Sequence, residues 1–484
     1  RVLAGDAIPV VAVGDDDQSI YGWRGAKIEN IQRFTQDFVG TQTVRLEQNY
    51  RSTKTILDAA NGVISHNAGR LGKDLWTDGE DGDPIKLYAG FNEQDESRFI
   101  VEQIQSWTDE GNPRKSSAIL YRSNAQSRVI EEALIRVGLP YRIYGGQRFY
   151  ERLEIRNALA YMRLIIGRGD DPALERIINT PTRGIGSKTV DDLRAIARDN
   201  NVSMWQAMGL AQQNGLLGSR ARSSLAGFAA LINELDSETV ELPLEEMVEH
   251  VIHRTGLIEF HKAEKGERGQ ARVENLEELV SAAKTFRAED DSLSPLQQFL
   301  DSAALDAGDS QADPYEDSVQ MMTLHSAKGL EFPLVILAGL EENLFPHRMS
   351  VEEPGRLEEE RRLAYVGITR AQQRLLITYA ESRRLHGSET YNTPSRFVRE
   401  IPADLIEEVR LHGGLTRPLA DRLQQPVGAS NDSGLFLGQR VTHPMFGEGM
   451  VLNIEGRGAN ARIEVNFAEG SKWLVLQYAN LQAL

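Results

Sequence analysis

The sequence predicts an α/β fold: a parallel sheet interrupted by an all-α insertion and followed by a small β-barrel. Three observations support this prediction. Short, continuously apolar runs, which are typical of strands buried on both faces, occur at 10–13, 117–121, 334–338 and 375–379. Helical periodicity replaces them between residues 151 and 305. Short segments of alternating apolar and polar residues, separated by turn residues, follow residue 439.

The first apolar run, Val10–Val13, ends in Gly14 and then in the polar cluster Asp15–Gln18. Ligands of open parallel sheets bind beyond the carboxyl ends of the strands, so we expect this cluster to face a ligand. Helical patterns at 127–137 and 358–366 accompany the other runs. Both ends of the first 410 residues are therefore predicted to be α/β.

The insertion is predicted from a run of helical patterns at 153–166, 189–198, 222–235, 244–255, 272–286 and 296–304. Residues 413–434 are rich in Gly, Pro, Ser, Gln and Asn, which predicts a flexible linker. The strands of the barrel are expected at 439–443, 449–454, 462–467 and 473–476.

Composition excludes several classes of protein. The 484 residues carry 54 Lys and Arg against 71 Asp and Glu, a net charge of −17, so a nucleic acid can bind only at local basic clusters. Without cysteine there is no disulfide framework and no thiolate metal site. No apolar stretch reaches the roughly 18 residues of a membrane span, and we expect a cytoplasmic protein. Because the chain begins at Arg1 rather than Met, we also expect an incomplete sequence.

The segment 14–26 (GDDDQSIYGWRGA) carries the most informative chemistry. The amide of Gln18, at the end of a predicted strand, can bond to a phosphate oxygen or to water. Trp23 beside Arg24 in a Gly-flanked loop suits stacking on a nucleic-acid base, a contact of about 1–3 kcal/mol. A capped loop with a partly buried Trp explains the same residues equally well.

Three further segments carry weaker signals. In 46–52, Arg51 presents a fork that matches phosphate and Tyr50 can stack on a purine, but a surface salt bridge is an alternative. The Lys-Gly loop in 323–333 can present backbone N–H groups to an anion. In 358–371 the charged first half is typical of a solvated helix face. Arg370 follows an apolar run and is a candidate buried functional arginine.

Taken together and in this order, the segments resemble the motifs of superfamily 1 DNA helicases of the UvrD/PcrA/Rep type, and most of all the UvrD branch. Segment 14–26 resembles helicase motif III, QNYRS at 48–52 motif IV, TLHSAKGLEFP at 323–333 motif V and EERRLAYVGITRA at 359–371 motif VI. The resemblance extends from about residue 11 to the C-terminus and includes ILYRSNAQSR at 119–128.

The resemblance implies two RecA-like domains that bind ATP between them. Gln18 then senses the γ-phosphate, Tyr50 stacks on adenine, and Arg51 and Arg370 reach the γ-phosphate from the second domain. Glu331 binds the ribose or couples ATP to DNA. Arginines that reach across a cleft stabilise the charge on a transferring phosphoryl group, which contributes about 10³–10⁵ in rate.

The resemblance also implies contacts to DNA. Trp23 becomes the residue that stacks on bases, and the candidate strand contacts are Arg24, Arg122, Asn124, Thr323 and His325. Thr182, Arg183, Gly184 and Gly186 belong to a segment similar to the GIG motif that binds duplex DNA, although an ordinary glycine-rich helix connection explains it too. The strand Arg374–Glu381 and the turn after it resemble the strand-separating pin, with His386 where relatives carry an aromatic residue at the tip.

The implied domains are the C-terminal part of the first RecA-like domain (1–47), the second RecA-like domain in two parts (48–145 and 317–412), the helical insertion (146–316), the linker (413–434) and a Tudor-like barrel (435–484). The resemblance makes the barrel a binding site for RNA polymerase, with Phe446 and Trp473 as candidate docking side chains. Trp473 is equally compatible with the barrel core. Other implied partners are single-stranded DNA, junctions of single- and double-stranded DNA, and repair proteins.

The pattern GxxxxGK[ST] of a P-loop occurs nowhere in the 484 residues, and neither does the acidic motif that binds Mg²⁺ in the family. ATP and Mg²⁺ are the implied cofactors, with most Mg²⁺ ligands expected outside this sequence. The complete protein is then an ATP-dependent 3′–5′ helicase in DNA repair, and the chain alone is expected to be inactive. The alternative is a truncated, non-catalytic module that binds DNA junctions and RNA polymerase. A helicase–nuclease is disfavoured because the tail offers only about 50 residues.

Overall fold

The computed structural model divides into two compact units, residues 1–419 and 420–484, which are considered separately. The residues that it describes are 9–22, 25–264, 267–288, 290, 292–308, 316–353, 355–385, 388–409, 440–443, 446–455, 462–467, 470–475, 479 and 481–483.

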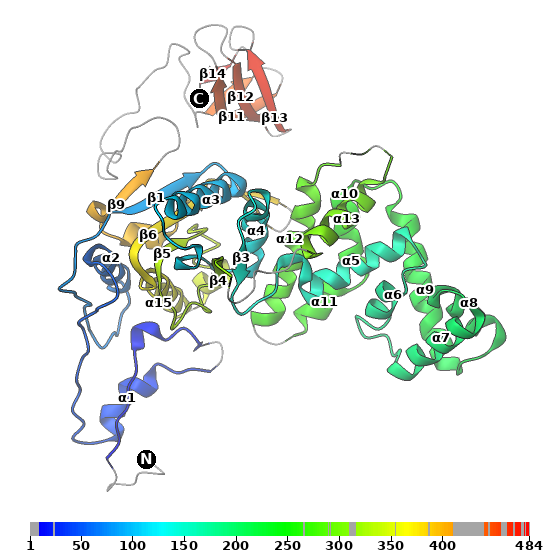
Figure 1. Cartoon of the computed structure of the whole chain (residues 1–484), viewed down its shortest axis with the longest axis horizontal. Coiled ribbons are helices and arrows are strands. Elements are labelled where there is room, and N and C mark those ends of the chain that lie inside the picture. Colours follow the sequence, from blue (N-terminus) through cyan, green and yellow to red (C-terminus); the bar gives the residue numbers. More distant parts are fainter. Residues whose placement is uncertain are drawn as a thin grey trace. The chain divides into compact units, whose positions relative to one another are not determined.

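The centre of the first unit is a sheet of seven parallel strands in the order β3-β4-β2-β5-β6-β1-β9 (Figure 1). The α/β prediction with a parallel sheet is confirmed. The strands are β1 (Ile85–Gly90), β2 (Ser117–Tyr121), β3 (Tyr141–Ile143), β4 (Val319–Thr323), β5 (Phe332–Leu337), β6 (Ala371–Ala380) and β9 (Ile406–Val409).

Helices cover both faces of the sheet, which is why its strands are continuously apolar. All five residues of β2 are buried, and its Ile119 and Leu120 belong to different core clusters. The helices α3 (Glu93–Asp109) and α4 (Ser127–Arg136) pack in the cluster of Ile119. The other face is covered by α2 (Lys54–Ile64), α15 (Arg356–Ile368) and α16 (Arg396–Glu400).

The described residues between β3 and β4 form helices and no strand, as the periodicity predicts. One large apolar core joins them. These helices are α5 (Leu153–Ile166), α6 (Asp171–Ile177), α7 (Ser187–Asn200), α8 (Met204–Asn214), α9 (Ser219–Thr239), α10 (Leu244–Arg254), α11 (Leu257–Lys262), α12 (Glu267–Thr285) and α13 (Pro295–Gly308).

Polar contacts fasten α12 to the segment that follows β2. Arg128 on α4 bonds to Glu278 at 2.6 Å, and the Ser123 hydroxyl donates to Glu274 at 2.5 Å. Arg152, which precedes α5, donates to Asn275 at 2.9 Å. These side chains are largely buried, so the helical block is tied to the sheet through α12.

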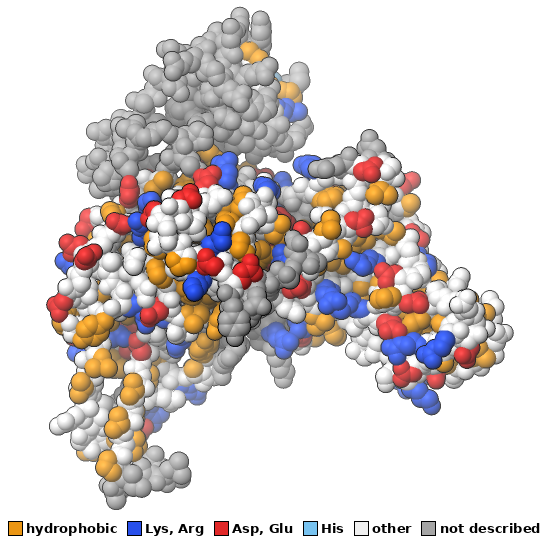
Figure 2. Space-filling model, viewed as in Figure 1, with side chains coloured by type: hydrophobic (Ala, Val, Ile, Leu, Met, Phe, Trp, Pro, Cys, Tyr) orange, Lys and Arg blue, Asp and Glu red, His pale blue; other side chains and the backbone are white. Residues whose placement is uncertain are grey.

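The N-terminal segment corrects one prediction. The run Val10–Val13 was expected to be a buried strand, but it forms no strand, and Val11 and Val13 are 88% and 91% exposed. No strand that the structure describes pairs with this run, so it lacks the neighbouring strands that bury a strand of a parallel sheet. Helix α1 (Glu29–Asp37) follows, and Figure 2 shows exposed hydrophobic side chains over this segment.

The expected hairpin is also shifted along the chain. Residues 374–380 belong to β6 in the middle of the parallel sheet rather than to a hairpin arm. The antiparallel pair is formed by β7 (Ser382–Leu385) and β8 (Ser388–Tyr391). His386, the predicted pin tip, lies outside the described residues.

In the second unit, five antiparallel strands form a sheet in the order β13-β12-β11-β10-β14. Its core contains Val441, Ile463 and Val465, with Phe446 packed against them. The side chain of Trp473 lies outside the description. Closure into a Tudor-like barrel stays a prediction. The strands are β10 (Arg440–His443), β11 (Gly447–Glu455), β12 (Arg462–Phe467), β13 (Gly470–Val475) and β14 (Gln482–Ala483).

No helix among the residues that the structure describes is both long and apolar enough to cross a lipid bilayer.

Candidate functional site

The segment that contains Gln18 is held in place by the loop after β4. Gln18 ends a short 3₁₀ helix (Asp16–Gln18), and its side-chain amide donates to Asp15 at 2.7 Å. The Lys328 ammonium donates to the backbone oxygen of Gln18 at 2.8 Å. Ile20 is fully buried in the sheet core. Motif III therefore contacts motif V directly, although 310 residues separate Gln18 from Lys328.

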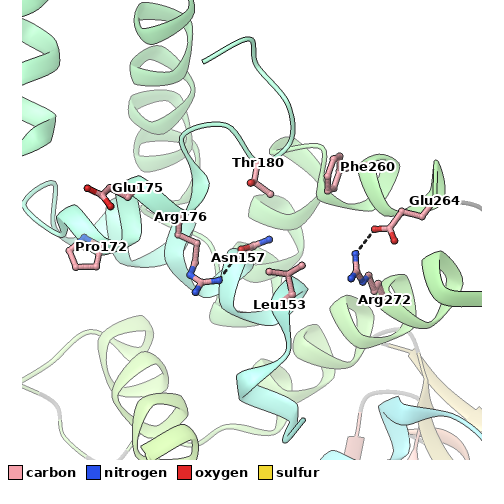
Figure 3. A pocket seen from close by; sticks show the side chains of 9 residues that line it. All are labelled: Leu153, Asn157, Pro172, Glu175, Arg176, Thr180, Phe260, Glu264 and Arg272. Carbon is pink, nitrogen blue, oxygen red and sulfur yellow. Dashed lines mark hydrogen bonds and ion pairs between the residues drawn. The ribbon is translucent and has the colours of Figure 1, made fainter. Parts of the chain in front are cut away.

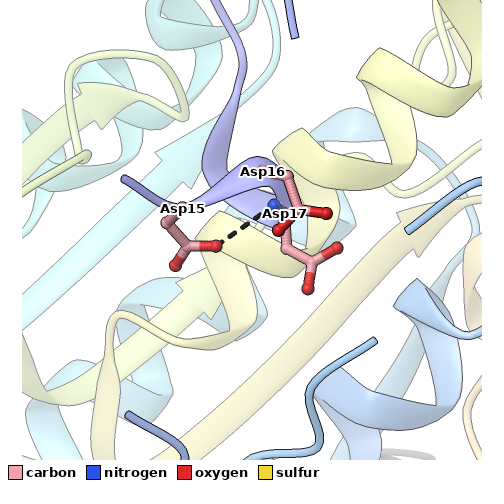
Figure 4. A group of neighbouring side chains, drawn as sticks. All are labelled: Asp15, Asp16 and Asp17. Atoms are coloured by element: carbon pink, nitrogen blue, oxygen red, sulfur yellow. Dashed lines mark hydrogen bonds between the residues drawn. The ribbon is translucent and has the colours of Figure 1, made fainter. Parts of the chain in front are cut away.

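Asp15, Asp16 and Asp17 form an acidic cluster (Figure 4) whose ligand atoms lie within 4.8 Å of one another. Each carboxylate already has a partner from the loop after α2. Arg70 binds Asp17 through two bonds of 2.9 Å, Lys73 binds Asp15 at 2.6 Å, and the amide of Leu71 donates to Asp16 at 2.9 Å.

Asp16 and Asp17 are also buried. A hydrated Mg²⁺ needs accessible carboxylate oxygens, so this cluster does not fit the metal. Its three carboxylates instead fasten motif III to residues 70–73.

Arg51 and Arg370 meet at the amino edge of the sheet, before β5 and β6. Arg51 forms an ion pair with Glu331, which precedes β5, and it donates to the oxygen of Thr369 at 3.4 Å. Arg370 directly precedes β6 and is buried, and its guanidinium donates at 3.0 Å to Val366 O, Leu330 O and Thr369 Oγ1.

The turn before α2 orients Arg51. The side-chain oxygen Oδ1 of Asn49 accepts bonds from the backbone amides of Arg51 and Ser52, at 2.8 and 2.9 Å. The Ser52 hydroxyl donates to the oxygen of Ala371 at 2.6 Å, which fastens the turn to the first residue of β6. Asn and Ser side chains commonly stabilise turns in this way.

The surroundings of Arg370 destabilise the charged form of its guanidinium. Burial and the positive charge of Arg51 lower the pKa of Arg370 to about 10, while Tyr365, Glu331 and Asp15 oppose the decrease. No carboxylate bonds to Arg370 among the residues that the structure describes. Arg51 is paired with Glu331, whereas Arg370 bonds to backbone and hydroxyl oxygens, so the two guanidiniums keep an excess of positive charge that favours an anion.

Tyr50 is 86% exposed, and its hydroxyl donates to Gln48 at 2.7 Å. Its ring is therefore open to stacking. Of the other predicted nucleotide residues, Arg51 pairs with Glu331, and Arg51 and Arg370 both bond to Thr369. Gln18 is linked to them through Asp15, which accepts a bond from Gln18 and whose charge opposes the lowering of the pKa of Arg370.

The predicted DNA contacts lie at the opposite, carboxyl edge of the sheet. Arg122 and Asn124 follow β2, and Thr323 and His325 lie at the end of the adjacent strand β4. The rings of His325 and Tyr21 are 6.3 Å apart, and the Thr323 hydroxyl contacts Ser326 at 3.0 Å. Trp23 and Arg24 lie outside the described residues.

Arg122 has a protein partner that the sequence does not reveal. Its guanidinium binds the carboxylate of Glu360 on α15 with bonds of 2.7 and 3.0 Å, and only 12% of its side chain is exposed. Burial raises the pKa of Glu360, but Arg122 and the amide of His347 outweigh it and hold this pKa below its usual range.

Replacing Arg122 with alanine is expected to lower the free energy of unfolding by about 3 kcal/mol, because the Glu360 charge stays buried without its partner. Urea unfolding followed by circular dichroism measures this change. The stabilisation is present above the ordinary carboxyl pKa and is lost as the pH falls through the lowered pKa of Glu360. An Arg122→Ala variant with unchanged stability contradicts the expectation.

The glycine-rich segment Thr182–Gly186 links α6 to α7. Arg183 points inward: its guanidinium donates to Pro181 O at 3.0 Å and lies 5.6 Å from the rings of Tyr161 and Phe228. Thr182, Gly184 and Gly186 are exposed, and Gly184 has a φ of +75° that favours glycine. In this segment Arg183 shapes the loop, and the glycines present backbone to solvent.

A cavity of about 580 Å³ lies in the helical block, between α5, α6, α11 and α12 (Figure 3). Arg272 bonds to Glu264, and Arg176 donates to Asn157 at 3.4 Å. None of its lining residues belongs to the predicted site.

Comparison with known proteins identifies the family. Residues 44–382 match the UvrD-like helicase C-terminal domain, and residues 1–39 match the UvrD/REP helicase N-terminal domain. The chain belongs to the UvrD-like helicase family. It is 56% identical over 487 residues to DNA helicase II of Escherichia coli (strain K12), covering 100% of this chain and 68% of the relative. DNA helicase II of Haemophilus influenzae is 54% identical, covering 100% of this chain and 67% of the relative. The ATP-dependent DNA helicase PcrA of Staphylococcus epidermidis is 40% identical, and the match covers 99% of this chain and 67% of the relative.

These matches confirm the sequence-based recognition of the chain as a UvrD-type helicase.

Several residues of this candidate site were missed by sequence reasoning. Lys328, Arg70 and Glu360 make the contacts that hold motif residues in place, and each contact joins distant parts of the chain. Lys328 and Glu360 lie inside recognised motifs, but the sequence does not predict which residues they contact.

Proposed function

We propose that this chain forms the arginine-bearing and strand-gripping part of an ATP-dependent DNA helicase that moves 3′–5′ along single-stranded DNA and unwinds duplex in DNA repair. The observation that carries the proposal is the pair of guanidiniums of Arg51 and Arg370. Both guanidiniums donate to Thr369, at 3.4 and 3.0 Å, beside the segment of Gln18, and burial together with the charge of Arg51 lowers the pKa of Arg370. Membership of the helicase family supports the same reading.

In this proposal the amino edge of the sheet binds ATP. The exposed ring of Tyr50 stacks on adenine, Glu331 binds the ribose or couples ATP to DNA, and Gln18 senses the terminal phosphate. Arg51 and Arg370 stabilise the charge that spreads over the phosphoryl oxygens during transfer. Mg²⁺ is the expected cofactor, but the carboxylates of the Asp15–Asp17 cluster are already bonded to protein partners and do not fit it.

The carboxyl edge of the sheet binds the single strand in this proposal. Thr323 and His325 contact the strand at the end of β4 and Asn124 after β2, together with Trp23 and Arg24. Arg122 lies at the same edge, where its guanidinium holds Glu360. Stacking on Trp23 is nearly independent of base sequence, which suits a motor that moves along any DNA.

The remaining parts have proposed partners. The exposed Gly184 and Gly186, with Thr182 and the loop-shaping Arg183, bind the duplex at a junction. The loop between β7 and β8, with His386, separates the strands. The domains are those implied by the resemblance, and the C-terminal sheet forms the Tudor-like barrel that binds RNA polymerase. A second candidate function is a non-catalytic module that binds DNA junctions. It applies if these 484 residues act without a P-loop supplied by another part of the protein, because they contain no P-loop motif.

Replacing Trp23 with alanine is expected to weaken binding of an oligo(dT) strand to the 484-residue chain by about tenfold, because one base-stacking contact is lost. Fluorescence anisotropy of a labelled oligonucleotide measures the dissociation constant. Trp76→Ala is the matched control, since the indole of Trp76 is half exposed but lies outside the motifs. Equal affinity for the parent and Trp23→Ala removes the stacking role.

A further inference from the structure

Helix α15 connects the two edges of the sheet. Its C-terminal end leads into Thr369 and Arg370 at the amino edge. Its first turns carry Glu359 and Glu360, whose partners lie at the carboxyl edge. Thirteen helical residues span about 20 Å. One rigid element therefore runs from the arginine pair to the predicted DNA face.

Glu360 anchors the N-terminal end of this helix. Besides Arg122, its carboxylate accepts bonds from the amide of His347 at 3.1 Å and from the Ser350 hydroxyl at 3.2 Å. The carboxylate is buried and satisfied, so the beginning of α15 has a fixed position at the carboxyl edge.

Glu359 makes a different contact. Its Oε1 accepts a 2.8 Å hydrogen bond from the backbone amide of Gly22, 337 residues earlier in the chain. A Cβ on Gly22 would lie 2.7 Å from Oε2 of Glu359, so the carboxylate lies directly against the glycine. The preceding residue, Tyr21, donates through its hydroxyl to the oxygen of His325 at 3.2 Å.

Among the residues that the structure describes, no cation forms an ion pair with the carboxylate of Glu359. Arg362, one turn further along α15, interacts with Glu359 only through its charge. The neighbouring Glu358 contacts Asn67 only through its backbone oxygen. Within the described part of the chain, the amide of Gly22 is therefore the hydrogen-bond donor to Glu359, and the next residue in the sequence is Trp23.

We propose that Glu359 is a positioning residue that fixes the amide of Gly22 on α15. It thereby ties the strand-gripping segment of motif III to the helix that ends at the arginine pair. This inference rests on the proposed function, and in it Glu359 affects DNA binding only through the position of Gly22. A carboxylate near the N-terminus of a helix is a favourable acceptor because the helix dipole stabilises its charge.

The first test is amide hydrogen exchange of residues 16–22 in the 484-residue chain, read by mass spectrometry. Glu359→Ala is expected to accelerate exchange of the Gly22 amide about tenfold, because its acceptor is lost. Glu359→Gln keeps an oxygen acceptor and is expected to restore slow exchange. Glu358→Ala removes an equal charge from the same turn and is expected to change nothing.

The second test is the affinity for oligo(dT), measured by fluorescence anisotropy. Glu359→Ala is expected to weaken binding several-fold, and Glu359→Gln to retain the affinity of the parent. Gly22→Ala displaces the carboxylate from the opposite side. Adding Glu359→Ala to Gly22→Ala is therefore expected to weaken binding no further, because both substitutions disrupt one contact.

Unchanged exchange at Gly22 in Glu359→Ala overturns the inference. So does fast exchange with unchanged DNA affinity, which makes the contact merely structural, or a double variant whose effects add. If the unsubstituted chain binds no oligonucleotide, the proposed function fails and this inference falls with it. A failure of the proposed function is distinguishable from a failure of this inference, because it appears in the unsubstituted chain before any variant is measured.

Discussion

Arg370→Ala is expected to lower the turnover number for ATP by about 10³-fold or more, because arginines at the transferring phosphoryl group contribute on that scale. The assay uses a chimera in which the part of E. coli DNA helicase II without a counterpart in this chain is joined to it. Phosphate release with oligo(dT) present measures turnover. The 484-residue chain alone is expected to release no phosphate, because it carries no P-loop motif.

The effect of Arg370→Ala is expected in kcat rather than in KM. Arg370 is held by three protein oxygens, and the charge on the phosphoryl oxygens that it is proposed to stabilise develops only in the transition state. Arg370→Lys keeps a charge but loses the planar fork, and it is expected to lose most of the rate with less loss of stability.

Arg374→Ala provides the control for Arg370. Arg374 lies on the same strand, β6, but its guanidinium pairs with Glu110 and Asp83 rather than with the arginine pair. Turnover of Arg374→Ala should match the parent. If Arg370→Ala raises KM while kcat stays unchanged, the transition-state role is wrong. Phosphate release by the unfused chain contradicts its predicted inactivity.

The regular elements were largely predictable because their signals are local. The strands at 117–121, 334–338 and 375–379 and the helices of the insertion follow from continuous apolar runs and from helical spacing. Strands such as Tyr141–Ile143 were not assigned, because three residues carry too little pattern to separate a strand from a loop. The run Val10–Val13 shows the converse limit: an apolar run becomes a buried strand only where neighbouring strands and helices cover it.

The candidate site was predictable as a set of residues but not as a set of contacts. Motif order identified Gln18, Arg51 and Arg370, and the structure brings Arg51 and Arg370 together beside the Gln18 segment. The bonds of Arg122 to Glu360 and of Arg183 to Pro181 were not foreseen. A guanidinium in a sequence suits phosphate, carboxylate or carbonyl equally, and only the fold decides which acceptor it meets.

Arg383→Ala is expected to lower the free energy of unfolding by about 3–5 kcal/mol, the range for removing one partner of a buried ion pair. Arg383 on β7 binds Glu341 at 2.6 Å and also pairs with Glu96. Glu341 is fully buried and Glu96 is 3% exposed. Opposing burial, the two carboxylates raise the pKa of Arg383, so the guanidinium stays charged in the folded state.

The large effect follows from two carboxylates that share one cation. Without Arg383, Glu341 keeps the amide of Ala380 and Glu96 keeps that of Gly339, both at 2.8 Å, but neither negative charge is balanced. Urea unfolding of the 484-residue chain measures the loss. Arg374→Ala breaks two largely exposed ion pairs, to Glu110 and Asp83, and is expected to cost about 1 kcal/mol, far less than Arg383→Ala.

A double variant shows whether the stability cost of Arg383→Ala comes from unbalanced charge or from lost side-chain packing. Glu96→Gln removes one buried negative charge, so Arg383→Ala should cost less in the Glu96→Gln background than in the parent. If lost packing were the whole cause, the cost would be equal in both backgrounds. A cost for Arg383→Ala as small as that of Arg374→Ala would mean that water solvates both carboxylates, and the β6–β7 corner would then not depend on this network for its stability.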